Sequence, residues 1–394
     1  MKEDRKHILF VCSWLNHKNN VGSFFIEQAK IFESDYEITM LNFKPFGLID
    51  FLKNIFFFNT EFYDKDLNKP YIIYVTHFDT KIFGRYFSDY LKKKVVSKVY
   101  HLIKSRRKKV DLIHTQSLFN SFEYVMIFNK LFKLKYLLTE HNQLSFFNKP
   151  KDIKQKVINF LDNSSYNLVV SNDKIRQFYT NGLFYDFWNV GNMVNEKLFY
   201  YKFNEKSDNI FRIITIGAYS KVKDQTTILK ALKIFEKKIG SRKTTFTWIG
   251  YNSWGIDKNK EVNKLIESFG FSKIEFILIP VLSRIEIQRY LQESNVFLFS
   301  SIVEGMPVSV LEALACGVPV ISTNCGGVDE LIDSENGKII PLFDFEKMEV
   351  FLEKIFQGEI KFEKNNISKK IHNFYGTQEF KIRVESFYKK ALNK

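Results

Sequence analysis

The chain has 394 residues, 45% of them hydrophobic, a formal net charge of +15 and three cysteines. This length exceeds one compact core and predicts two domains, while three irregularly spaced cysteines exclude a disulfide framework or a cysteine metal site and indicate a reduced, cytoplasmic setting. The first apolar run, residues 8–12, is too short for a signal peptide, and no uncharged apolar stretch reaches the about 18–20 residues that cross a bilayer. A soluble or peripheral protein is therefore expected.

In the first half of the chain, buried-strand patterns alternate with helical periodicity. Strands are expected at residues 7–13, 36–42, 71–76, 110–115, 135–140 and 167–171, the last closing the sheet. Helices are expected at residues 23–32 and 121–131. Residues 46–59 are crowded with large apolar side chains, which fits either a helix that packs inward or an exposed apolar ridge.

A strongly basic helix is expected at residues 91–109, which contain lysines and arginines but no acidic residue. Leu91, Val95, Val99 and Leu102 recur at helical spacing. Two interpretations stay open, a contact with an anionic membrane and an ordinary domain helix with a solvated lysine face. Nucleic-acid binding is disfavoured because no recognisable binding motif accompanies the charge.

The second half of the chain begins with a turn-rich segment, residues 190–199, in which Gly191 and Asn192 supply turn chemistry. A second alternation of strands and helices starts near Phe211. At the end, Thr377 is a candidate N-cap for a last amphipathic helix, whose apolar positions are Phe380, Val384, Phe387 and Leu392.

The most informative segment runs from Ser300 to Ile332. A β-rich run at residues 296–299 precedes a Gly-Met-Pro turn, and a helix is predicted at residues 310–316, closed by Gly317 and Pro319. A second β-branched run follows at residues 320–323. This order is the repeating unit of a parallel α/β sheet, in which ligands bind at the carboxyl ends of the strands.

The chemistry of this unit favours an anionic ligand. Pro307 suits the first helical position, the first-turn N–H groups and the helix dipole attract a diphosphate, and Gly305 permits close backbone approach. Glu312 lies five residues beyond Pro307, about 7–8 Å along the axis, within reach of a ribose, and Glu304 lies on the other side, where a sugar would be. Alternatively, Glu304 only favours the helix dipole and Glu312 is a solvated surface residue.

This window resembles the donor-binding motif of the retaining glycosyltransferases of family 4, which have the GT-B fold. The positions that match the family pattern are Glu304, Gly305, Pro307, Glu312, Ala313, Ala315, Gly317, Pro319, Val320, Ile321, Gly326, Gly327, Glu330 and Leu331. The resemblance implies that Glu304 contacts the donor sugar and Glu312 the ribose. It also implies that the backbone around Gly305 and Met306 contacts the diphosphate.

Three further segments carry the resemblance. Gly217 and Lys223 match a glycine and a lysine that face the donor diphosphate in the family, whereas Ala218 replaces the family's arginine and Asp224 its glycine. Gly22 and Ser23 open a helix that faces the diphosphate and acceptor in the family. The resemblance places His141, after Thr139 and Glu140, beside the transferred sugar or acceptor. Lys221 is interpreted as a surface lysine, His114 as structural, and residues 279–282 as the segment that reads the nucleobase.

The resemblance implies an α/β fold of the GT-B type, with two Rossmann-like, doubly wound domains facing a central cleft. Residues 1–195 would bind the acceptor and residues 196–376 the nucleotide-sugar donor, with a helix at 377–394 that packs back on the first domain. The implied activity is transfer of a hexose from a UDP- or GDP-sugar to a hydroxyl group, with retention of configuration, in cell-surface polysaccharide or lipid-linked glycan synthesis.

Glu304, His141 and Lys223 are the expected catalytic residues, and neither a metal nor another cofactor is expected. The Asp64–Asp66 pair is interpreted as a solvated turn. The expected partners are a nucleotide-diphosphate sugar and a glycan or lipid-linked acceptor, at a cytoplasmic location with possible contact to the inner membrane face. Two alternatives stay open, a weak or inactive nucleotide-sugar-binding protein, favoured by Ala218, and a nucleotide-sugar epimerase on the same fold.

Overall fold

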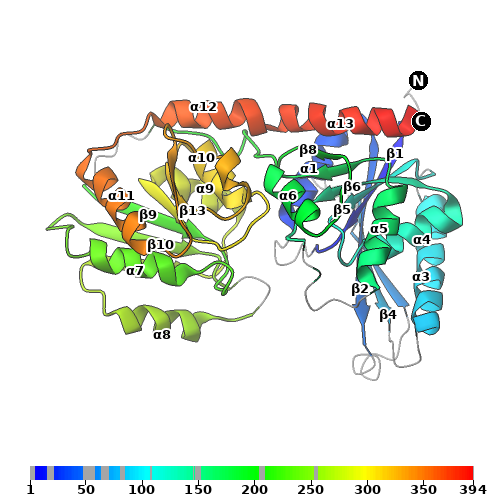
Figure 1. The fold of residues 1–394 in the computed structure, drawn as a ribbon, viewed down its shortest axis with the longest axis horizontal. Helices are drawn as coiled ribbons and strands as arrows, with labels where there is room; N and C mark the ends of the chain where they lie inside the picture. Colours follow the sequence, from blue (N-terminus) through cyan, green and yellow to red (C-terminus); the bar gives the residue numbers. More distant parts are fainter. Residues whose placement is uncertain are drawn as a thin grey trace. The chain divides into compact units, whose positions relative to one another are not determined.

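The computed structural model describes residues 5–15, 22–47, 58–63, 71–79, 85–106, 109–144, 146, 152–203, 209–252 and 256–393. The chain divides into two compact units, each with its own sheet (Figure 1). Unit 1 contains residues 1–190 and 381–394, and unit 2 contains residues 191–380. The sequence-based boundaries lay five residues later, at 195, and four residues earlier, at 376, than these divisions.

Unit 1 is built on an eight-stranded sheet with the order β3-β4-β2-β1-β5-β6-β7-β8. Its strands are β1 (His7–Cys12), β2 (Glu37–Phe46), β3 (Phe58–Tyr63), β4 (Tyr71–Phe78), β5 (Leu112–Gln116), β6 (Lys135–Glu140), β7 (Asn167–Val169) and β8 (Phe187–Asn189). Every pair is parallel except β3–β4, which is antiparallel. The helices are α1 (Ser23–Phe32), α3 (Arg85–Arg106), α4 (Phe122–Phe132), α5 (Ile153–Asn163), α6 (Asn172–Thr180) and most of α13 (Thr377–Asn393).

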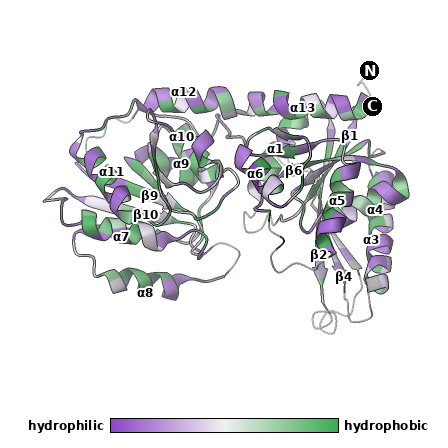
Figure 2. Ribbon diagram, in the orientation of Figure 1, coloured by the Kyte–Doolittle hydropathy of each residue, from purple (hydrophilic) through white to green (hydrophobic). Residues whose placement is uncertain are grey.

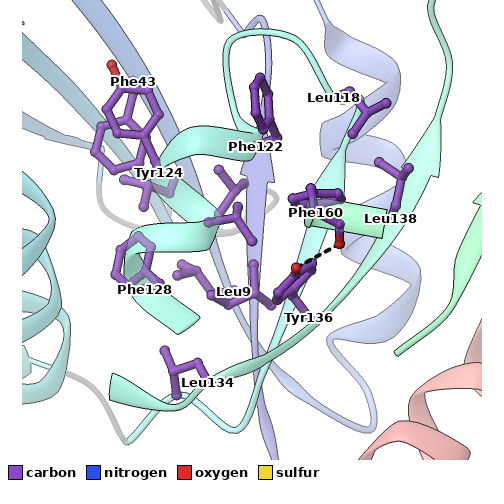
Figure 3. Close-up of a cluster of buried hydrophobic side chains, with 14 of the residues drawn as sticks. Leu9, Phe43, Leu118, Phe122, Tyr124, Phe128, Leu134, Tyr136, Leu138 and Phe160 are labelled. Atoms are coloured by element: carbon purple, nitrogen blue, oxygen red, sulfur yellow. Dashed lines mark hydrogen bonds between the residues drawn. The ribbon is translucent and has the colours of Figure 1, made fainter. Parts of the chain in front are cut away.

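Helices cover both faces of this sheet. Successive side chains of a strand point to opposite sides, and in β1 both sets are buried and mostly apolar. Leu9 and Val11 of β1 lie in a hydrophobic cluster with residues of α3, α4 and α5, part of which is drawn in Figure 3. The intervening residue Phe10 instead contacts Phe32 of α1, with a ring-centroid distance of 6.3 Å. Within the cluster the Tyr136 hydroxyl donates to the Phe160 carbonyl oxygen at 2.8 Å (Figure 3), so the one polar atom of that ring is satisfied.

Unit 2 has a six-stranded, wholly parallel sheet with the order β11-β10-β9-β12-β13-β14. Its strands are β9 (Phe211–Ile216), β10 (Thr244–Ile249), β11 (Ile274–Ile279), β12 (Val296–Phe299), β13 (Val320–Thr323) and β14 (Gly337–Ile340). The helices are α7 (Gln225–Phe235), α8 (Asn259–Phe269), α9 (Arg284–Glu293), α10 (Val308–Ala315), α11 (Phe345–Gln357) and α12 (Lys364–Tyr375), with a short 3₁₀ helix, η3 (Gly327–Glu330).

The strand order fixes where ligands are expected in each unit. In unit 2 the chain moves outward from β9 in one direction and then restarts at β12 in the other, so β9 and β12 flank the topological switch point. In unit 1 the corresponding pair is β1 and β5. Ligands of open α/β sheets bind outside the carboxyl ends of such strand pairs.

The structure corrects several sequence predictions. The strand at 167–171 does not close the first sheet, because the short strand β8 pairs with β7 beyond it. The antiparallel strand β3 was also missed. Residues 48–57 of the apolar stretch and the Asp64–Asp66 pair lie outside the described residues. Pro307 is the N-cap of α10, with an extended backbone (ψ 117°), rather than its first helical residue.

The basic helix α3 packs its apolar side into the core of unit 1. Val95 and Val99, together with Val96 and Ile103, are buried, whereas Lys93, Lys94 and Lys98 are exposed. The buried valines are therefore not available for insertion into a lipid layer while unit 1 is folded. What α3 offers to solvent is a lysine face that also carries the exposed rings of Tyr86 and Tyr90.

Helices α12 and α13 show alternating hydrophilic and hydrophobic residues along their length (Figure 2), as amphipathic helices do. Phe380, Val384, Phe387 and Tyr388 of α13 are buried. Thr377 is the first residue of α13 rather than its N-cap, and its N–H and hydroxyl donate to Glu196 at 2.9 and 2.6 Å. In the described parts of the chain, no helix has both the length and the apolar character that a membrane span requires.

Candidate functional site

The switch point of unit 2 carries the predicted donor residues. Gly217 directly follows β9, and residues 300–307 connect β12 to α10. The four first N–H groups of a helix lack intrahelical acceptors, so the start of α10 presents donors and the positive end of its dipole toward this loop. An anion is the ligand that such a helix start prefers.

Contacts from Gly327 and Asn192 hold the loop before α10 in place. The Gly305 carbonyl accepts from Gly327 N–H at 2.9 Å, which ties the loop to η3. The side-chain amide of Asn192 donates to the Met306 carbonyl at 2.8 Å, and its backbone N–H lies 3.2 Å from Met306 Sδ. Asn192 is buried, so its contacts with Met306 are shielded from water. The sequence predicted only a turn at Asn192 and gave no sign of its contact with the loop before α10.

Lys223 and Glu304 are direct partners. Lys223 Nζ lies 2.5 Å from Glu304 Oε1, and the side chains are 29% and 16% exposed, so both charges remain reachable from solvent. The ammonium also lies 5.5 Å from the centre of the Phe299 ring. The loop that carries Lys223 is fixed to the neighbouring strand, because Ser300 Oγ donates to the Lys223 carbonyl at 2.9 Å.

The departures from the family pattern have visible structural consequences. Asp224 has φ 43° and ψ 50°, a left-handed conformation that glycine adopts freely and aspartate tolerates better than most residues. At Ala218 the side-chain amide of Gln225 donates to the backbone carbonyl at 2.7 Å. A Cβ built on Gly217 would meet nothing closer than Lys223 Cδ at 3.9 Å, so Gly217 and Lys223 border one space.

Glu312 is not a solvated surface residue. Its side chain is 6% exposed, and Arg284 Nη2 lies 2.8 Å from Glu312 Oε1. Arg284 is the first residue of α9 and its guanidinium lies 5.0 Å from the centre of the Phe199 ring. Sequence reasoning missed Arg284, although it stands two residues after the segment 279–282 that was expected to read the nucleobase.

Cys325 lies near the Lys223–Glu304 pair, but its thiol does not have the properties of a nucleophile. Burial raises the pKa of the Cys325 thiol to about 12, and the negative charge of Glu304 adds to that rise. Cys12 and Cys316 are buried as well, and all three cysteines are free. Each thiol therefore stays protonated at neutral pH.

In unit 1 the structure brings the start of α1 and His141 together. His141 directly follows β6, and its ring makes edge contacts with Phe24 and Phe25 of α1, both at 5.3 Å. Gly22 is the N-cap of α1, with φ 73°, and a Cβ there would lie 2.7 Å from the Trp14 carbonyl oxygen. Only glycine fits this position, and Ser23 follows as the first helical residue.

The orientation of His141 is set by residues at the carboxyl end of β5. His141 Nε2 lies 2.7 Å from Gln116 Oε1, and its backbone N–H donates to Ser117 Oγ at 3.1 Å. Because an amide oxygen only accepts, Nε2 carries the proton in this contact. Gln116 was not identified from the sequence, since a lone glutamine after a strand gives no distinctive signal.

His114 is a structural residue held between two hydroxyl groups. Its Nδ1 lies 2.6 Å from the Tyr388 hydroxyl of α13 and its Nε2 lies 2.7 Å from Thr139 Oγ1. Burial, and next the nearby His141, hold the pKa of His114 well below its usual value. His114 is therefore neutral at physiological pH and connects α13 to the centre of the first sheet.

The family of the second unit follows from sequence comparison. Residues 198–371, which include Glu304 in the β12–α10 loop and Glu312 in α10, match the family described as glycosyl transferases group 1. This matching segment, less than half of the chain, is called the group 1 domain below. The match confirms, at the level of the group 1 family, the resemblance predicted from residues 304–331.

Two relatives of the chain are named for polysaccharide biosynthesis. The chain is 28% identical over 160 residues to the amylovoran biosynthesis glycosyltransferase AmsK of Erwinia amylovora, covering 38% of this chain and 36% of that protein. It is 26% identical over 221 residues to the capsular polysaccharide biosynthesis glycosyltransferase CapM of Staphylococcus aureus, covering 48% and 58%. The chain thus matches less than two thirds of the length of either relative.

The fold of the whole chain is shared with solved glycosyltransferases. Anabaena HepE in complex with UDP superimposes with a TM-score of 0.71 at 15% identity, covering 98% of this chain and 100% of that chain. The prediction of two Rossmann-like domains of the GT-B type is confirmed, whereas the central cleft stays a prediction. The predicted site residues of the group 1 domain are Gly217, Lys223, Glu304, Gly305, Met306, Pro307 and Glu312, and those of unit 1 are Gly22, Ser23 and His141.

Proposed function

We propose that the chain transfers a hexose from a nucleotide-diphosphate sugar, a UDP- or GDP-sugar, to a hydroxyl acceptor with retention of anomeric configuration. The observation that carries this proposal is the Lys223–Glu304 pair, 2.5 Å apart, on the loops that follow the two switch-point strands of the group 1 domain. The positive charge of Lys223 suits a departing diphosphate, and the carboxylate of Glu304 suits the hydroxyl groups of a sugar. The HepE structures named for UDP and UDP-glucose support a UDP-sugar as the first donor to test.

The proposed chemistry needs the chain to stabilise negative charge on the leaving group. The acceptor oxygen forms a bond to the anomeric carbon on the face from which the diphosphate departs, and a diphosphate oxygen takes the acceptor proton. Lys223, the first-turn N–H groups of α10 and the helix dipole supply the positive field, a role for which fixed donors are effective. Glu304 then exchanges its ammonium partner for hydroxyl groups of the sugar, and neither a protein base nor a metal is required.

His141 and Glu312 have binding roles in this proposal. His141, with its Nε2–H held by Gln116, orients the transferred sugar or the acceptor. Glu312 accepts hydrogen bonds from ribose hydroxyls while its ion pair with Arg284 orients the carboxylate. The names of AmsK and CapM support a cell-surface polysaccharide or lipid-linked glycan as the product.

The test is a panel of nucleotide sugars, with released nucleotide measured by mass spectrometry for the wild type and for Glu304→Ala and Lys223→Ala. We expect each variant to lose at least about a hundredfold in turnover, the scale of removing one stabilising group from a transition state. Lys221→Ala and Glu267→Ala, which replace exposed residues of the same unit, are matched controls and should retain the wild-type rate. Rates within about threefold of the wild type for both site variants, under ~0.7 kcal/mol, would refute the assignment.

Ala218 favours a second candidate, a nucleotide-sugar-binding protein with little turnover. The family's arginine is missing there, and the Ala218 carbonyl is occupied by Gln225. Calorimetry with UDP and GDP beside the turnover assay separates the two functions. Binding without release of nucleotide from any sugar of the panel would establish the second candidate.

A further inference from the structure

Unit 1 contains a charged pocket that none of the site residues above uses. It has a volume of about 390 Å³, within the range of about 300–1,000 Å³ that is usual for small-molecule sites. Its charged lining residues are Asp79, Asp89, Lys92, Glu123, Asp152 and Lys156. All of them belong to unit 1, so the pocket is formed by that unit alone.

The topology places this pocket at the edge of the sheet where ligands bind. Asp79 follows the last residue of β4, and Glu123 lies in the first turn of α4, soon after β5. Asp152 is the N-cap of α5, and Lys92 comes from α3. The carboxyl end of the parallel strands and the starts of two helices therefore surround one cavity.

The charges of the pocket are fixed by ion pairs. Lys92 is 8% exposed, and its Nζ lies 2.6 Å from Glu123 Oε2 and 3.5 Å from Asp79 Oδ2. Glu123 also pairs with Lys156, and these two lysines lower the pKa of the Glu123 carboxyl to about 2 although burial opposes the shift. Glu123 therefore stays ionised at neutral pH, and its ion pairs with both lysines connect α3, α4 and α5.

Four carboxylates against two ammonium groups leave the pocket with two negative charges in excess. An anionic ligand is repelled there, and more strongly than in water because the cavity has protein walls. Hydroxyl groups suit the lining, since a carboxylate accepts and an ammonium donates hydrogen bonds. Phe119 and Ile153 add apolar surface on which the C–H face of a sugar ring can pack.

We propose that this pocket binds an uncharged sugar ring of the glycan acceptor, and that it excludes uronic-acid and phosphate-bearing rings. The inference rests on the proposed function and specifies the acceptor class of that reaction. It assigns acceptor recognition to the edge of unit 1 between α3, α4 and α5. Gly22, Ser23 and His141 are not among the residues that line it.

The test uses methyl glycosides as probes, with binding to the full chain measured by saturation-transfer NMR. The neutral probes are the glucoside, galactoside, mannoside and N-acetylglucosaminide, and the anionic probes are the glucuronide and galacturonide. At least one neutral glycoside should bind, with an affinity at least about tenfold above that of its uronide. Asp89→Asn and Asp152→Asn should each weaken the neutral probe by about tenfold, since each removes a charged acceptor.

Asp186→Asn, an exposed carboxylate of the same unit outside the pocket, is the charge-matched control and should bind as the wild type does. Uronides that bind as tightly as neutral glycosides, no binding of any glycoside, or unchanged binding by both pocket variants would overturn the proposal. Calorimetry with UDP and with GDP on the same samples reports on the donor site separately. A wild type that binds neither nucleotide would count against the proposed function, whatever the glycosides do.

Discussion

Lys223 Nζ and Glu304 Oε1 are 2.5 Å apart, although 81 positions separate them in the chain. The parallel order β9–β12 brings them together, because it places the carboxyl ends of two neighbouring strands at the same edge of the sheet. Without a ligand, each charge satisfies the other. A nucleotide sugar would offer both groups a new partner at once, a diphosphate for the ammonium and hydroxyl groups for the carboxylate.

The Arg284–Glu312 pair predicts a stability effect. Replacing Arg284 by alanine leaves the carboxylate of Glu312 without its cation in a site where that side chain is 6% exposed. We expect a loss of about 3 kcal/mol in the free energy of unfolding, the scale for breaking a buried ion pair by removing one partner. Urea denaturation measures it, with Arg289→Ala on the exposed side of α9 as the control. Equal stability of the two variants would show that the pair contributes little.

A matched pair of glycine substitutions tests the geometry at the start of α1. Gly22→Ala must adopt φ 73° and would place its Cβ 2.7 Å from the Trp14 carbonyl, so it should cost at least about 1–2 kcal/mol. Gly47→Ala, where an added Cβ meets nothing within 4 Å, should change stability by less than about 0.5 kcal/mol. Denaturant titration of both variants gives the comparison. A Gly22 variant as stable as the Gly47 variant would contradict the structure of this turn.

Buried histidines predict a pH dependence of stability in the weakly acidic range. Burial holds the pKa of His114, and that of His77, below the ordinary value of 6.5. The unfolded chain then binds protons that the folded chain does not, so stability falls as pH drops below about 6.5 and is unaffected by these groups above it. Chemical denaturation between about pH 7.5 and about pH 5.5 measures the slope, to which each histidine adds up to about 1.4 kcal/mol per pH unit.

The variant His114→Asn tests whether His114 causes part of this pH dependence of stability. In His114→Asn the slope over the same range should decrease, whatever the absolute stability of the variant is. Carboxyl groups whose pKa is lowered, such as Glu123 at about 2, destabilise the fold only below their ordinary value of 4.5. Burial raises the pKa of Glu140, and this shift opposes the histidine slope rather than producing it, because the folded chain then takes up that proton first. An unchanged slope would mean that His114 is not the buried neutral group described above.

The exposed face of α3 predicts only a weak electrostatic contact with membranes. Its valines are buried in unit 1, so a contact would depend on Lys93, Lys94 and Lys98. We expect co-sedimentation with phosphatidylglycerol vesicles at low salt, its loss at high salt, and its loss in the triple variant with glutamates at these lysines. Binding to neutral phosphatidylcholine vesicles that resists high salt would contradict this electrostatic account.

Most of the fold could be predicted from the sequence because parallel strands are buried on both faces and read as short apolar runs. The strand at residues 135–140 and the helix at 23–32 were located to the residue. Strand β8 was missed because it is short and half exposed, and its pairing with β7 depends on tertiary structure alone. Pro307 was predicted to be the first helical residue of α10, but it is the N-cap. The sequence does not separate the two positions, because proline suits either.

The candidate site was predictable where a motif marked it and not where a neighbouring segment completes it. Glu304, Glu312 and Lys223 belong to recognisable patterns. Arg284 and Asn192 do not, because their roles arise from contacts with α10 and its preceding loop that only the fold creates.

The most direct test of the donor site is calorimetric titration of UDP into the wild type, Lys223→Ala and Lys221→Ala. The account predicts that loss of the Lys223 ammonium raises the dissociation constant at least about tenfold, the value of one charge-assisted contact, whereas Lys221→Ala leaves it unchanged. Equal affinity of all three proteins, or a loss at Lys221 rather than Lys223, would contradict the assignment of the diphosphate to the start of α10.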